Sequence, residues 1–218
     1  MSPNHWRADR SMPAFSLIEL VAVMAILVIL MASGISLMHG TGSQSRKAAM
    51  DLLAGMVELA RASAINSRCY VVLALAAPGD IPMGDERCRV GLFKVETWPD
   101  AATATVQGEF LTRWRTLDSG ILLLGGAMDG ADNPIDGTPL TISDGAASPR
   151  IFTVHALVFN PCGGLHYPIG SLPVALRVAE GVGRASQAAS LPFGAAGGIP
   201  ESRLQIGRVA ARSYRIDR

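Results

Sequence analysis

The chain is short of charge and of cysteine. Of its 218 residues 17% are charged, below the roughly 25% typical of soluble domains, whereas 49% are hydrophobic. Three cysteines, Cys69, Cys88 and Cys162, are too few for a disulfide scaffold, and their odd number leaves at least one thiol unpaired or intermolecular. The charge deficit points to a membrane segment.

No excess of either sign of charge is present. The formal net charge is +1, and Arg7, Asp9 and Arg10 precede Phe15, so 19 − 2 = 17 basic residues face 18 − 1 = 17 acidic residues from Phe15 onward. This balance excludes an overall basic field that would steer the chain to nucleic acid.

Recognisable catalytic motifs are also lacking. The four histidines, at positions 5, 39, 155 and 166, form no spaced ligand set, and no HExxH, GxSxG or P-loop pattern occurs. We expect His155 to be an ordinary strand residue. The sequence predicts a protein that is not an enzyme and has no cofactor.

What the chain does contain is one long apolar run. Between Phe15 and Met38 the only formally charged residue is Glu19, and a helix over these 24 residues would be about 36 Å long. We therefore expect a leader at 1–14 and a transmembrane helix at 15–38. Arg7 and Arg10 lie just before the run, which favours a cytoplasmic N-terminus and an outward-facing remainder.

Glu19 distinguishes this run from a plain anchor. An ionised carboxylate inside a membrane helix costs roughly 2.5–3.5 kcal/mol unless it is paired. Cleavage between Ala14 and Phe15 would create an α-amino group four residues before Glu19, able to pair on the same helix or on a neighbouring subunit. A cleaved secretory signal ending near Ser33 and an unprocessed single-span anchor with a periplasmic β domain remain alternatives, but neither explains the acid.

The stretch AFSLIELVAVMAILVILMASG, residues 14–34, resembles the N-terminal signal of type IV prepilins and type II secretion pseudopilins. This resemblance implies that a prepilin peptidase cuts between Ala14 and Phe15 and methylates the new amine. It also implies that Glu19 neutralises the amine of an adjacent subunit during assembly. Ala14 stands where the family nearly always has glycine.

The same resemblance implies the partners and the location. The partners are the prepilin peptidase, other pilin or pseudopilin subunits, an inner-membrane assembly platform and membrane lipid. The precursor is expected in the bacterial inner membrane with its head in the periplasm, and the mature subunit in a type IV pilus or type II secretion pseudopilus.

Beyond the apolar run the hydrophobic pattern changes. At 39–68 apolar residues recur at steps of three and four and predict an amphipathic helix whose buried stripe is Ala49, Leu52, Leu53, Met56, Val57, Ala60 and Ala64. Residues 69–218 predict a β-rich head. The expected fold class is α+β, a type IV pilin-like fold with a long N-terminal helix, half transmembrane and half amphipathic, on an antiparallel sheet or sandwich.

Individual strands follow from local patterns. Segments 69–75 and 87–95 predict a hairpin, in which Cys69 lies opposite about residue 93 and Cys88 opposite about residue 74, so a Cys69–Cys88 bridge is not favoured. FLTRWRTL and ILLL predict a second hairpin around the turn at 118–120, and 151–159 predicts a strand. Short segments of the head also resemble GspH/FimT-type minor pseudopilins, among them RWRTLDSGILL, ALVFNPCGG and GRVAARSYRI.

Two further segments could be binding sites or ordinary solvated surface. The first is the acidic loop. Asp129, Asp132 and Asp136 offer carboxylates to calcium, which some pseudopilins bind, although their spacing is not that of an EF-hand and also suits an ordinary turn.

The C-terminal arginines are the second of these sites. Arg208, Arg212 and Arg215 lie in the densest basic stretch and suggest DNA contacts of a DNA-uptake or adhesive minor pilin, with Arg208, Arg212 and Tyr214 on one strand face. The alternative to DNA binding is a structural role, in which the arginines form a charged, solvated sheet edge.

Overall fold

A computed structural model describes residues 17–78, 80, 87–99, 105–126, 130–145, 149–184, 187–190 and 201–217; for 28–43, 182–190 and 217 it describes the backbone only. The chain divides into two compact units, Met1–Thr41 and Gly42–Arg218. Helix α1 (Leu17–Ser67) contributes to both units, and every strand belongs to the second unit, which we call the head.

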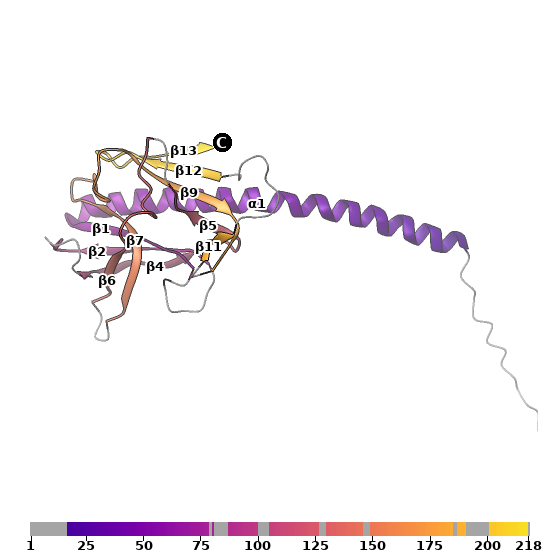
Figure 1. Ribbon diagram of the computed structural model, residues 1–218, viewed down its shortest axis with the longest axis horizontal. Helices are drawn as coiled ribbons and strands as arrows, with labels where there is room; N and C mark the ends of the chain where they lie inside the picture. Colours follow the sequence, from indigo (N-terminus) through magenta and orange to yellow (C-terminus); the bar gives the residue numbers. More distant parts are fainter. Residues whose placement is uncertain are drawn as a thin grey trace, which may run out of the picture. The chain divides into compact units, whose positions relative to one another are not determined.

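The head contains two main sheets (Figure 1). The seven-stranded sheet has the order β3-β6-β7-β1-β2-β4, with β8 also paired to β7. Its strands are β1 (Tyr70–Ala76), β2 (Arg89–Val95), β3 (Val106–Gln107), β4 (Glu109–Thr116), β6 (Leu140–Ser143), β7 (Ile151–Phe159) and β8 (Leu165–Tyr167).

The smaller sheets come from the rest of the chain. The four-stranded sheet has the order β13-β12-β9-β5 and consists of β5 (Ile121–Leu124), β9 (Val174–Glu180), β12 (Glu201–Ile206) and β13 (Ser213–Asp217). Strands β10 (Val182–Arg184) and β11 (Gln187–Ser190) form a separate pair.

The α1 part of the head uses the predicted apolar stripe. Leu53, Val57, Ala60 and Ala64 are fully buried, and Leu52 packs against the core while remaining half-buried. This stripe joins one core with residues from both sheets, including Leu73 of β1 and Leu176 of β9. Burial of a stripe at steps of three and four confirms the amphipathic helix prediction, because only one side of α1 meets the sheets.

A second core lies inside the seven-stranded sheet. Strands β3 and β4 stand at the two ends of its strand order but are separated in sequence by Gly108 alone, so the sheet curls back toward itself. A Cβ on Gly108 would lie 3.1 Å from Phe93 Cβ, and the Gly108 N–H donates to Ser143 O at 2.9 Å. The curled sheet encloses an aromatic cluster of Phe93, Phe110, Trp114 and Phe152.

The expected fold class, an α+β type IV pilin-like fold with a transmembrane helix half, is wrong. The described structure is mostly β, with thirteen strands, and after Ser67 it contains no helix. Among the described residues no helix has the length and hydropathy needed to cross a membrane. The class was extrapolated from the N-terminal pattern, whereas strand pairing across the whole head determines the architecture.

Some strand predictions are confirmed and others are wrong. Segments 69–75 and 87–95 form the β1–β2 hairpin, but Ala74 pairs with Gly91, three positions from the expected register. Strand β7 occupies 151–159 as predicted. The second hairpin is wrong, because β4 pairs with β2 and β5 pairs with β9 in the other sheet. The Leu117 N–H donates to Cys88 O at 2.9 Å, which keeps the end of β4 beside β2.

Candidate functional site

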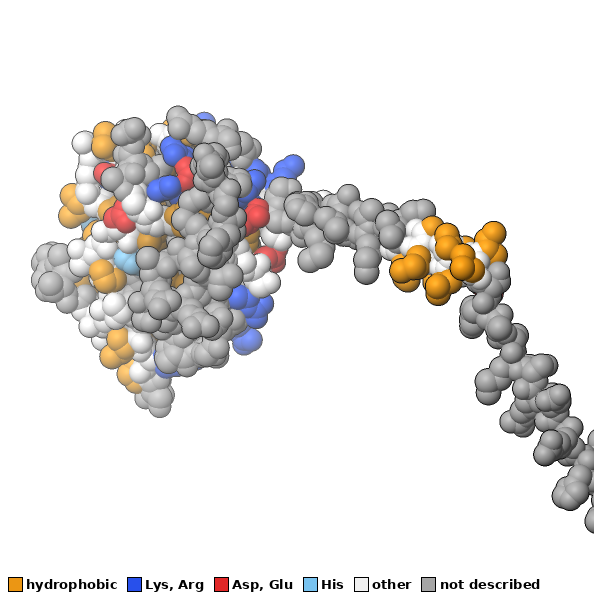
Figure 2. Space-filling view, turned by 45° about the vertical axis from the view of Figure 1, so that its right-hand side comes forward, with side chains coloured by type: hydrophobic (Ala, Val, Ile, Leu, Met, Phe, Trp, Pro, Cys, Tyr) orange, Lys and Arg blue, Asp and Glu red, His pale blue; other side chains and the backbone are white. Residues whose placement is uncertain are grey.

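The exposed segment 17–27 of α1 is the candidate assembly site. Its eleven residues include eight large hydrophobic side chains, each 48–80% exposed: Leu17, Ile18, Leu20, Val21, Val23, Met24, Ile26 and Leu27. Figure 2 shows these side chains gathered as an orange cluster on the helix. Their positions along the sequence place them all round the helix, so the segment has no polar face. An exposed apolar surface of this kind is characteristic of a segment that packs against other apolar groups.

Glu19 is the single charged residue of this segment, in the first turn of α1. Its side chain is exposed, and an acid near a helix N-terminus is favoured by the helix dipole. Ala14 and Phe15, the predicted cleavage and methylation positions, lie outside the described residues.

The structure brings together two residues predicted for different sites. Asp132, a calcium candidate, and Arg208, a DNA candidate, form an ion pair with Oδ2 and Nη2 separated by 2.6 Å. The Arg208 guanidinium also donates to the carbonyls of Pro168 and Leu172, and its side chain is only 14% exposed. Each charge is therefore engaged within the head instead of facing an external ligand.

The remaining calcium candidates do not form a site with Asp132. Asp136 accepts two hydrogen bonds from the Gly126 N–H, both at 2.8 Å, and Asp129 lies outside the described residues. Over the described part of the chain no three His, Cys, Asp or Glu side chains are placed to hold a metal ion.

The remaining basic candidates are separated from Arg208. Arg208 and Arg212 both lie in the turn between β12 and β13, so the expectation that a strand face presents them with Tyr214 is wrong. Arg215, on β13, pairs with Asp51 of α1 at 3.7 Å. The turn forms because β12 ends at Ile206 and Ala211 adopts a positive φ of 44°.

The sequence analysis missed a charged cluster on the four-stranded sheet. Arg177 and Arg203 face each other on β9 and β12, and Glu201 receives 2.6 Å contacts from both. Burial raises the pKa of the Glu201 carboxyl, but the hydrogen bonds and positive charges of the two arginines outweigh it and hold that pKa below its usual value. The alternation of polar and apolar residues in β12 indicates one exposed face, but only the register pairs Arg203 with Arg177 of β9.

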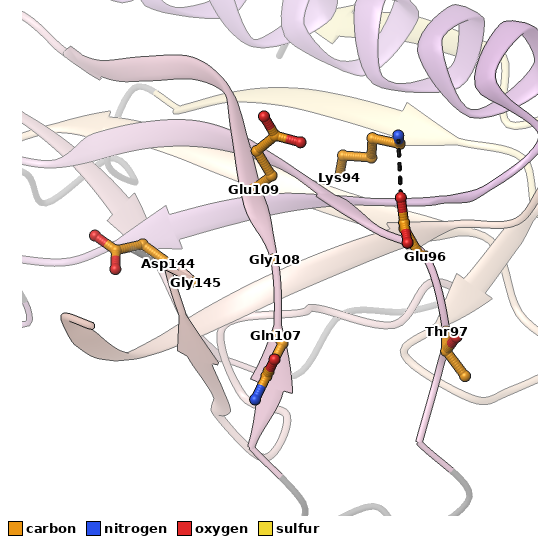
Figure 3. A pocket seen from close by; sticks show the side chains of 8 residues that line it. All are labelled: Lys94, Glu96, Thr97, Gln107, Gly108, Glu109, Asp144 and Gly145. Atoms are coloured by element: carbon orange, nitrogen blue, oxygen red, sulfur yellow. Dashed lines mark ion pairs between the residues drawn. The ribbon is translucent and has the colours of Figure 1, made fainter. Parts of the chain in front are cut away.

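A polar groove of about 620 Å³ opens beside the closure of the seven-stranded sheet (Figure 3). Lys94 and Glu96 point toward each other at 3.6 Å, and the Asp144 carboxylate is occupied by Arg150 at 2.9 Å. The described residues that line it include no histidine, cysteine or serine; they are Lys94, Glu96, Thr97, Gln107, Gly108, Glu109, Asp144 and Gly145. The groove offers carboxylates and one amine but no nucleophile paired with a base.

The three cysteines are free. Cys162 is exposed in the turn after β7, whereas Cys69 and Cys88 are buried. Burial raises the pKa of the Cys88 thiol; a backbone hydrogen bond with Leu123 acts in the opposite direction, and the charge of Asp80 adds to the rise. The buried thiols therefore behave as core residues.

Among the described residues the exposed apolar segment with Glu19 is a feature that the head's own packing does not explain. Of the predicted acidic and basic residues, Asp132 and Arg208 pair with each other, and Arg215 pairs with Asp51. Comparisons with protein-family models, with curated proteins and with solved structures find no match to this chain.

Proposed function

We propose that this protein is a prepilin-like pilin or pseudopilin subunit, cut before Phe15 and N-methylated by a prepilin peptidase. The observation that carries the proposal is the exposed apolar segment 17–27 with Glu19 as its one charge. Burying each large side chain of such a segment is worth roughly 1.5–3 kcal/mol, so the segment favours assembly with similar helices or with lipid over exposure to water.

In this proposal Glu19 is the assembly contact. A carboxylate buried among apolar helices needs a cation, and the new α-amine at Phe15 of an adjacent subunit supplies one. Before assembly the precursor is located in the bacterial inner membrane, with its N-terminus in the cytoplasm and its head in the periplasm. Its work is mechanical: copies that meet through two different surfaces form a type IV pilus or a type II secretion pseudopilus.

Processing is tested by the mass of the N-terminus. The full chain is expressed with a prepilin peptidase, purified in detergent and digested, and the N-terminal peptide is identified by mass spectrometry. We expect a methylated Phe15 as the first residue. An intact Met1, or a start near Gly34, would contradict the proposal and favour an unprocessed anchor or a cleaved secretory signal.

Assembly is tested by Glu19→Ala. We expect the variant to remain in the membrane fraction and to lose its incorporation into sheared filaments, because the apolar contact keeps its area but loses its charge pair. Glu96→Ala is the matched control, since the Glu96 side chain is 84% exposed on the head and outside segment 17–27. Equal incorporation of the Glu19→Ala variant and the wild-type chain would overturn the role of Glu19.

A further inference from the structure

An apolar tip forms where the turn after β12 meets the loop after β8. Ile169, Leu172 and Val209 are 86%, 45% and 92% exposed, respectively. Arg208 lies beneath them and binds the carbonyls of Pro168 and Leu172, and its own carbonyl accepts the Leu165 N–H at 2.8 Å. The exposed side chains are thus presented on loops tied together by a mostly buried guanidinium, which lowers the ordering cost of binding.

A small apolar pocket lies at the start of the α1 part of the head. Its cavity is about 170 Å³, comparable with the roughly 150 Å³ cavities that accept an apolar molecule the size of benzene. The pocket is formed where α1 passes the β4–β5 turn, and its lining is Ala48, Ala49, Leu52, Thr116, Leu117 and Asp118. We call it the helix-side pocket.

The tip and the helix-side pocket lie toward opposite ends of the head. The pocket includes Ala48, whereas the β12–β13 turn that carries Val209 lies against Gly164, next to Gly163, which packs on Ile65 of α1. From Ala48 to Ile65 the helix rises about 25 Å at 1.5 Å per residue. Figure 1 shows the turn between β12 and β13 at the same end of the head as the C-terminus of α1.

Charges flank both surfaces in a complementary manner. Arg212 is exposed beside Val209 in the β12–β13 turn, and Asp118 is exposed at the rim of the pocket. Among the described residues neither side chain has an ion-pair partner, in contrast to Arg208 and Asp132. A contact that seats the tip in the pocket therefore also brings an unpaired cation to an unpaired carboxylate.

We propose that the apolar tip of one copy binds the helix-side pocket of a second copy of this chain, with Val209 in the pocket and Arg212 beside Asp118. The two surfaces differ, so the contact is head-to-tail and repeats in an open chain along the direction of α1 instead of closing into a dimer. The inference rests on the proposed function, which it deepens by naming the head surfaces that touch between neighbouring subunits.

Cysteine cross-linking of the full chain tests the contact. A Cys162→Ser background removes the exposed native thiol, and Ala48→Cys and Val209→Cys are added together; copper phenanthroline is the oxidant. We expect a ladder of covalent multimers from the double variant, and monomers from either single variant. Ile151→Cys with Ala48→Cys is the matched control, since Ile151 is 63% exposed but far in sequence from the tip, and we expect no ladder from it.

Charge reversal provides a second measurement. Arg212→Glu should reduce the ladder, and adding Asp118→Arg should restore it. A double cysteine variant that gives no more multimer than the single variants would overturn the proposal, as would dimers from Val209→Cys alone, which indicate a tip-to-tip contact. The N-terminal mass of the same samples separates the two hypotheses: a processed N-terminus without a ladder refutes this contact alone, whereas an unprocessed N-terminus refutes the proposed function.

Discussion

The carboxylate of Asp132 and the guanidinium of Arg208 lie 2.6 Å apart although 76 positions separate them in sequence. Their contact joins the loop before β6 to the turn after β12. Arg208 continues to the carbonyls of Pro168 and Leu172, so one side chain connects three loops at one end of the head. Removing the Arg208 side chain should lower the stability of the head, because this side chain is only 14% exposed and its contacts with Pro168 and Asp132 are half-buried.

Arg208→Ala is expected to destabilise the head by roughly 1–3 kcal/mol, since it leaves two carbonyls and one carboxylate without their donor. The measurement is urea unfolding of the detergent-solubilised chain, read as a lower midpoint at unchanged slope. Arg212→Ala is the matched control from the same turn and should change stability by no more than about 0.5 kcal/mol. Equal midpoints for the two variants would show that the Arg208 contacts contribute little.

Calcium should not stabilise the head. Asp132 is paired with Arg208, and Asp136 is occupied by the Gly126 N–H, so neither carboxylate is available without breaking an existing contact. Thermal unfolding with excess calcium and with a chelator should therefore give the same midpoint. A bound site filled at one hundred times its Kd would add about 2.7 kcal/mol, and an increase of that size would contradict this prediction.

Glu201→Gln should change the pH dependence of stability. The pKa of Glu201 is held below its usual value in the folded protein, so its carboxylate contributes stability above the unfolded pKa, and this is lost as pH falls through the folded pKa. The variant should be less stable than the wild-type chain at neutral pH, and the difference in stability should narrow as the pH falls below the ordinary glutamate pKa of about 4.3. Urea midpoints across this range measure it.

Glu96→Gln is the control for that series. The Glu96 side chain is 84% exposed, whereas that of Glu201 is 12% exposed between two arginines. The midpoint difference between Glu96→Gln and the wild-type chain should therefore stay small and nearly constant with pH. If the midpoint difference between Glu201→Gln and the wild-type chain were equally independent of pH, the contacts of the Glu201 carboxylate with the two arginines would not contribute to stability.

A glycine pair tests the closure of the seven-stranded sheet. A side chain at Gly108 meets Phe93 Cβ at 3.1 Å and Lys94 O at 3.4 Å, so Gly108→Val should overpack the crossing and cost roughly 1–3 kcal/mol. Gly55 is helical and a Cβ there meets nothing within 4 Å, so Gly55→Ala should stabilise α1 by about 0.5–1 kcal/mol. We expect the urea midpoint to fall for Gly108→Val and to rise for Gly55→Ala. An unchanged midpoint for Gly108→Val would show that the packing around Gly108 leaves room for a side chain.

Several elements of the fold were predictable because their signal is local. Strand β7 alternates between exposed and buried residues in its first half and continues as an apolar run to the Asn160 turn, and the α1 stripe repeats at the helical period, so both are visible within a short window. The prediction of a β4–β5 hairpin was wrong because the partner of β5 is not determined by the local sequence. A four-residue turn between two strand-like segments suits a hairpin, yet nothing local shows that β5 belongs beside β9, more than fifty positions later.

The candidate sites divide in the same way. The isolated position of Glu19 in an apolar run is a property of the sequence alone, because charge and spacing are visible without any contact. The pairing of Arg208 with Asp132, and that of Arg177 and Arg203 with Glu201, depends on strand register and loop placement. A shift of one residue in β9 or β12 would turn the arginine of that strand to the opposite face of the sheet.

Local pattern therefore establishes an apolar N-terminal run with one acid, an amphipathic helix after it and a strand-rich remainder. Long-range packing alone decides that the strands form one curled sheet and one smaller sheet, and that Asp132 and Arg208, predicted for different sites, form an ion pair. The physical reason is range: backbone periodicity acts over a few residues, whereas a salt bridge or a strand pair requires two distant segments to arrive at one place.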